Sequence, residues 1–267
     1  MTTLAYTVTD SATMLRRNLK HALRYPVLTL MVAVIPIVLL LLFVYVFGGT
    51  LGAGLGGLSG GIPMGRAEYA EFLTPGILVL AIASAAQGTA ITVAMDMNEG
   101  IIARFRTMSI ARASVLTGHV VGAVIQTMIG LAFVVVVSLL VGFRPDASVV
   151  EWLAAIGLLV LTSFALSWLS VAMGLAAKSV EGASNLPMPL ILLPFLGSGF
   201  VPTESMPPGL AWFAEYQPFT PIIDTLRGLL TGSAIGSSGV LAVAWCAALA
   251  LVGYLWARAR YDRRPAR

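Results

Sequence analysis

The sequence predicts an all-α integral membrane protein with six transmembrane helices. Hydrophobic residues make up 58% of the 267 residues, whereas charged residues make up only 10%. The apolar residues gather in runs close to the ~20 residues that a membrane-spanning helix requires. Six such runs occur, over residues 27–47, 72–95, 115–141, 152–177, 186–201 and 240–257. An even number of spans places both ends of the chain on one side.

The distribution of positive charge predicts which side that is. Thirteen of the sixteen Lys and Arg residues fall on the side of the two chain ends, and only Arg66, Arg144 and Arg227 fall on the other. Because Lys and Arg are retained in the cytoplasm during insertion, both termini are expected to be cytoplasmic. The sequence pI of about 9.5 then reflects topology rather than nucleic-acid binding.

Three segments are expected along the chain: a cytoplasmic interfacial helix over residues 1–26, a six-helix membrane domain over 27–257 and a basic cytoplasmic tail over 258–267. In the first segment, helical spacing separates an apolar arc from a basic one. The residues that define these arcs include Leu15, Leu19 and Leu23, and Arg16, Arg17, Lys20 and Arg24. Such a helix would lie in the inner headgroup layer and contact membrane lipid. The alternative is a basic flank that only fixes topology.

The sequence predicts no catalytic, cofactor or metal site in this chain. Cys246 is the single cysteine, and His21 and His119 lie far apart without a metal-binding motif. Neither Lys20 nor Lys178 stands in a phosphate-binding GxxxxGK[ST] loop. The span interiors also contain almost no ionisable group that could couple transport to an ion gradient. Energy is therefore expected to come from another subunit.

The polar side chains inside the spans admit two interpretations. They include Gln87, Thr92, Ser163, Ser167 and Ser170. They can form hydrogen bonds between helices, or they can contact a transported substrate. Gln87 and Thr92 are the candidates for a pathway.

The loop between the second and third spans predicts a docking surface for a cytoplasmic partner. Its apolar residues recur at helical spacing beside several cations, so a short helix could insert into a groove of the partner. The residues expected to act there are Asp96, Glu99, Gly100, Ile101, Arg104, Phe105, Arg106, Met108 and Arg112. The alternative is that this apolar face rests in the membrane interface.

Three stretches carry a resemblance to a known family. They are Leu42–Gly49 with Tyr69, Phe72, Leu73, Pro75, Gly76 and Ile77; Asp96 with Gly100, Arg104–Arg106, Ile110–Arg112, Val115 and Gly118; and Phe200–Pro202 with Glu204, Met206, Pro207, Leu210, Phe213, Pro218–Pro221, Leu226, Arg227 and Leu229. In order and spacing they resemble the permease subunits of ABC-2 type exporters, most closely the actinobacterial daunorubicin-resistance type. Ser109 departs from the family, whose members commonly have Pro there.

The resemblance implies a multi-pass permease of the bacterial plasma membrane that pairs with a second permease copy or a related permease. Two cytoplasmic ATPase subunits, which hold ATP and magnesium, would drive it through the second loop, with the N-terminal helix also in contact. It would export a drug, antibiotic or lipid.

The family also suggests an outer re-entrant helical hairpin before the last span, which the prolines after residue 186 support in part. Glu204, Glu215, Asp224 and Arg227 are then candidates for an outer gate. The alternative is that they are solvated loop charges.

Two other function classes stay open at this point. The chain could be a non-transporting anchor or sensor subunit for such an ATPase. It could also be an ATP-independent carrier or channel, although no charged or carbonyl-rich filter motif is present.

Overall fold

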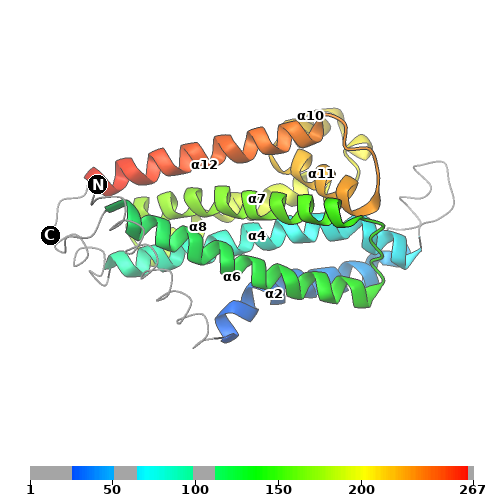
Figure 1. Cartoon of the computed structure of the whole chain (residues 1–267), viewed down its shortest axis with the longest axis horizontal. Helices are drawn as coiled ribbons and strands as arrows, with labels where there is room; N and C mark the ends of the chain where they lie inside the picture. Colours follow the sequence, from blue (N-terminus) through cyan, green and yellow to red (C-terminus); the bar gives the residue numbers. More distant parts are fainter. Residues whose placement is uncertain (1–25, 51–64, 99–111, 264–267) are drawn as a thin grey trace.

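The computed structural model describes residues 26–50, 65–98 and 112–263. Every regular element in these ranges is helical, and the long helices run side by side in a bundle (Figure 1). The long elements are α2 (Pro26–Leu41), which continues as a π-helical turn (Leu42–Phe47), α4 (Arg66–Asn98), α6 (Arg112–Val141), α7 (Val149–Ala176) and α12 (Ser238–Arg263). The prediction of an all-α membrane protein is therefore confirmed at the level of fold class.

Five helices are long and apolar enough to cross a membrane, among the described residues. Their outer faces carry large exposed apolar side chains, such as Leu140 on α6, Val149 on α7 and Val240 on α12, which are 76–80% exposed. A soluble protein rarely exposes apolar surface on this scale, whereas a helix facing lipid does.

The predicted fifth span, at residues 186–201, is broken into short pieces. The chain passes through α8 (Val180–Asn185), α9 (Met188–Leu192) and a 3₁₀ turn (Leu193–Leu196). Pro189 and Pro194 lie at the starts of the last two pieces, where a missing N–H is tolerated. Proline prevents one continuous helix here, so the prediction of six spans is not confirmed.

The chain then returns through a 3₁₀ turn (Thr203–Ser205), α10 (Pro208–Tyr216) and α11 (Phe219–Thr231) before α12 begins. In Figure 1, α10 and α11 lie at the end of the bundle where α6 connects to α7. This is the outer end of the predicted topology. Whether α10 and α11 re-enter a membrane stays a prediction.

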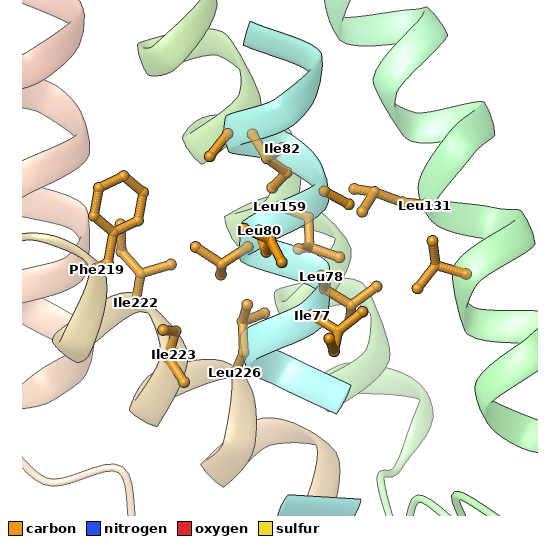
Figure 2. Packing of buried hydrophobic residues seen from close by; sticks show 14 of the residues in the cluster. Ile77, Leu78, Leu80, Ile82, Leu131, Leu159, Phe219, Ile222, Ile223 and Leu226 are labelled. Carbon is orange, nitrogen blue, oxygen red and sulfur yellow. The ribbon is translucent and has the colours of Figure 1, made fainter. Parts of the chain in front are cut away.

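Helix α4 is the centre of the bundle. Its apolar residues Ile77, Leu78 and Leu80 are almost fully buried. Figure 2 shows them between Leu131 of α6, Leu159 of α7 and the α11 residues Phe219, Ile222, Ile223 and Leu226. Helix α11 is thus part of the core and not a surface loop.

Small residues allow the central helices to approach each other closely. A Cβ atom at Gly174 of α7 would lie 2.6 Å from the carbonyl oxygen of Ala90 on α4, and one at Gly253 of α12 would lie 2.5 Å from the backbone nitrogen of Leu169. Close backbone approach of this kind provides van der Waals contact between helices in lipid, where the hydrophobic effect does not drive association. Helices α4, α7 and α12 therefore form a tightly packed unit.

Candidate functional site

Most of the predicted partner-docking residues lie outside the described residues. This applies to Glu99–Met108 in the second loop and to Leu15–Arg24 of the predicted interfacial helix. Arg112 begins α6, and Asp96 lies in the last turn of α4. The structure thus describes the two helices that flank the second loop.

The Asp96 carboxyl and the His119 imidazole are in contact at this end of the bundle. The His119 Nε2 atom lies 3.2 Å from the Asp96 Oδ2 atom, and the two side chains are only 10% and 12% exposed, respectively. The pair joins α4 to α6. Ionisable side chains that contact each other within a bundle of apolar helices mark a position with a structural or functional role.

A second cluster of polar groups is centred on Arg227 of α11, at the outer end. Its Nη1 atom donates to the Asp224 Oδ1 atom at 2.8 Å, and its Nη2 atom donates to the carbonyl oxygen of Ser198 at 2.6 Å. The guanidinium also lies over the ring of Phe72, 4.3 Å from the centroid. One side chain thereby connects α11, the broken fifth segment and α4.

Two further contacts hold the broken segment in place. The Ser198 hydroxyl donates to the Asp224 Oδ1 atom at 2.6 Å. A Cβ atom at Gly76 of α4 would lie 2.5 Å from the carbonyl oxygen of Gly199, so the two backbones pass in close contact. Arg227, Asp224, Ser198 and Phe72 are called the outer cluster below.

The outer cluster contains two of the four predicted outer-gate residues. Asp224 and Arg227 come together, but Glu204 and Glu215 are exposed on the neighbouring 3₁₀ turn and α10. The described structure therefore brings together part of the predicted set. It adds Ser198 and Phe72, which the sequence reasoning did not select because their contacts span 26 and 155 positions.

The predicted pathway residues Gln87 and Thr92 both form hydrogen bonds to backbone carbonyl groups. The Gln87 amide donates to the carbonyl oxygen of Ser184 at 2.7 Å, which connects α4 to α8. The exposed Thr92 hydroxyl donates to the carbonyl oxygen of Gly88 within α4 at 2.9 Å. Gln87 therefore joins two elements, whereas Thr92 does not.

The buried serines of α7 give a different result. Ser163 and Ser170 are 1% and 0% exposed, and their hydroxyls have no hydrogen-bond partner in the described structure. The interpretation that polar side chains in the spans form hydrogen bonds between helices therefore does not apply to Ser163 and Ser170.

Helix α8 begins at a capping residue at the end predicted to be cytoplasmic. The Ser179 hydroxyl accepts from the backbone N–H of Gly182 at 3.1 Å, which satisfies one of the free donors of the first turn. Hydrogen bonds from the Glu181 backbone amide and from Ser179 lower the pKa of the Glu181 carboxyl.

The described residues contain no group of three or more His, Cys, Asp or Glu side chains that could hold a metal ion.

Comparison with known proteins gives one family and several relatives. Residues 10–231 match the family model described as ABC-2 type transporter. The chain is 28% identical over 232 residues, which is 86% of this chain and 78% of the relative, to the daunorubicin resistance ABC transporter permease protein DrrB1 of Streptomyces coeruleorubidus. It is 23% identical over 177 residues, 65% of this chain and 64% of the relative, to the probable doxorubicin resistance ABC transporter permease protein DrrC of Mycobacterium tuberculosis.

Proposed function

Because the chain belongs to the ABC-2 type transporter family, we propose that it is the permease subunit of an ATP-driven exporter of the bacterial plasma membrane. The family match over residues 10–231 carries this proposal. The apolar helices, which contain few ionisable groups, support it since such a chain has little with which to use an ion gradient.

The proposed cargo is a hydrophobic or amphipathic drug. The relatives named for daunorubicin and doxorubicin resistance support this substrate class. Two copies of the chain, or one copy with a related permease, would face each other and pass the cargo between them. A cytoplasmic ABC ATPase, in two copies, would hold ATP and magnesium.

We assign the coupling contact to the second loop, with Arg104 and Arg106 as its central cations, and an auxiliary contact to the N-terminal helix. Both are proposed to face the cytoplasm, as the charge distribution indicates. Movement of the partner would enter the bundle through the flanking helices α4 and α6.

The outer cluster is the proposed exit gate. Arg227 connects α4, the 197–200 segment and α11, and all three elements end near the outer face. Separating them would break charge-assisted hydrogen bonds, which are roughly twice as strong as neutral ones. The gate would therefore stay closed until the bundle changes shape.

The proposal is tested with inverted membrane vesicles that contain the chain and an ATPase that copurifies with it. We expect ATP-dependent accumulation of daunorubicin, and its loss when Arg104 and Arg106 are both changed to Glu. Arg66→Glu, on the outer side of the predicted topology, is the matched control. Hydrolysis that depends on the permease without any accumulation would instead support the sensor function, and a chain that captures no ATPase would refute the proposal.

A further inference from the structure

The contact between Asp96 and His119 lies where movement of a partner would enter the membrane domain. Asp96 lies two residues before the end of α4, and His119 lies in the second turn of α6. The two residues are 23 positions apart in the chain, with the second loop between them. Their contact is therefore a direct connection between the two helices that this loop joins.

The pair adjoins a compact apolar cluster formed by the same two helices with α7 and α12. Val93 of α4 and Val120 of α6 are fully buried there, with Trp168 of α7 and Ala257 of α12. Removing either side chain would remove the 3.2 Å contact that the other makes between the two helices. The two residues therefore act as a unit.

Asp96 has an unfavourable position within its own helix. A carboxylate in the last turn lies near the negative end of the helix dipole, which would favour a cation instead. The position of this acid is therefore not favoured by α4 itself, and its carboxyl contacts His119 of the neighbouring helix.

Each of the two helices also packs against other parts of the bundle. One turn before Asp96, the close contact of Ala90 and Val93 with Gly174 holds α4 against α7. Near its start, α6 contributes Leu116 and Val120 to the apolar cluster. The contact between Asp96 and His119 adds a directional polar interaction between α6 and the tightly packed unit of α4, α7 and α12.

We infer that Asp96 and His119 are positioning residues that hold α4 and α6 together, so that movement at the second loop displaces both helices in concert. This inference rests on the proposed function. It assigns a role to His119, which no sequence motif selects.

The first experiment measures coupling in proteoliposomes that contain the complex with its ATPase. We expect Asp96→Asn and His119→Gln each to lower the amount of daunorubicin exported per ATP roughly tenfold. His119→Gln, which lies outside the predicted docking set, should leave complex formation and basal hydrolysis intact. The exchanged variant, Asp96→His with His119→Asp, should recover most of this ratio. The control is Asp146→Asn, which neutralises an exposed acid at the opposite end.

These variants distinguish positioning from simple stabilisation. A purely structural role would lower thermal stability and reduce hydrolysis and export in proportion, without rescue by the exchange. If a neutral variant fails to accumulate, His119→Arg, which retains a hydrogen-bond donor for Asp96, should retain the wild-type amount of drug exported per ATP. The inference would be overturned if the single variants exported as much daunorubicin per ATP as the wild type. It would also be overturned if the exchanged variant were as defective as the single variants.

A second measurement does not depend on transport. Spin labels at Asn98 and Val121, in a Cys246→Ser background, report the distance between α4 and α6. We expect the distance distribution to broaden in each single variant and to narrow again in the exchanged variant. If the distribution broadens and narrows as expected but the wild-type complex exports no drug, the proposed function is refuted and the positioning role of Asp96 and His119 is retained. If the wild-type complex exports normally but the distribution is the same in all variants, only the positioning role is refuted.

Discussion

The two ends of the bundle are held together in different ways. At the inner end, Asp96 and His119 connect two long helices, and one of them, α4, also packs closely against Gly174 of α7. At the outer end, Asp224 and Arg227 lie three residues apart on α11, and the guanidinium reaches the backbone of the broken fifth segment. The inner connection joins the side chains of two regular helices. The outer connection supplies a hydrogen-bond donor to a backbone carbonyl group in a segment that is not a regular helix.

This difference follows from the local sequence. Regular helices satisfy their own backbone hydrogen bonds, so their contacts can rely on packing of small residues. Proline and glycine between residues 187 and 199 prevent such a helix, and freed carbonyl groups at membrane depth need protein donors. Arg227 provides such a donor for Ser198. We therefore expect the inner end to be sensitive to side-chain volume and the outer end to loss of donors.

The largest effect is expected for Gly174→Leu, which tests the volume sensitivity of the inner end. The new side chain would meet the backbone of Ala90 and push α4 away from α7. We expect a loss of about 3 kcal/mol or more in stability, measured as reduced thermal stability and reduced accumulation in the membrane.

Gly157→Leu is the matched control, because it lies on the same helix with no neighbouring atom within 4 Å of an added Cβ. Equal stability of Gly174→Leu and Gly157→Leu would contradict the expected sensitivity of the inner end to side-chain volume.

The second effect, Arg227→Gln, tests the dependence of the outer end on one donor. Asp224 would lose its partner, and the Ser198 carbonyl would lose its hydrogen bond. We expect a loss of about 2 kcal/mol, because Asp224 is partly exposed and water can replace some of the contact. Thermal unfolding in detergent measures this.

Arg227→Lys should recover only part of the loss, since one ammonium cannot reproduce the fork geometry of the guanidinium. Arg66→Gln, at an exposed arginine of the same end, should have wild-type stability. Equal stability of Arg66→Gln and Arg227→Gln would contradict the proposed role of the outer cluster.

The sequence predicted what depends on composition and periodicity. The apolar runs located the five long helices, because length and hydropathy are properties of contiguous residues. The bounds moved by several residues, since polar end turns such as Arg66–Glu71 extend α4 beyond its apolar run.

Contacts between distant segments could not be predicted in the same way. His119 has a partner 23 positions away, and Arg227 contacts a residue 155 positions away, so neither contact follows from local spacing. One signal was available. Asp96 falls at the end of one predicted span and His119 near the start of the next, so both lie on the same predicted side of the membrane and can come into contact.

A third, smaller effect separates structural from transport roles within α4. Gln87→Leu would remove the donor to Ser184 and loosen α8, at a cost of about 1 kcal/mol. Thr92→Val, whose hydroxyl bonds only within its own helix, should change stability by less than about 0.5 kcal/mol. Paired measurements of thermal stability and daunorubicin export check both. A strong loss of export in Thr92→Val at unchanged stability would show that Thr92 contacts the cargo.

The smallest effect is expected for Glu204→Gln combined with Glu215→Gln. Both side chains are exposed beside the outer cluster, so their charges are screened by solvent and salt. We expect stability within about 0.5 kcal/mol of the wild type, and export reduced less than about twofold. Asp224→Asn, which alters the cluster itself, should reduce both more. If the double variant instead abolished export at normal stability and surface level, the two acids would be part of the exit path, and the outer gate would extend from the backbone-binding arginine to the exposed face of α10.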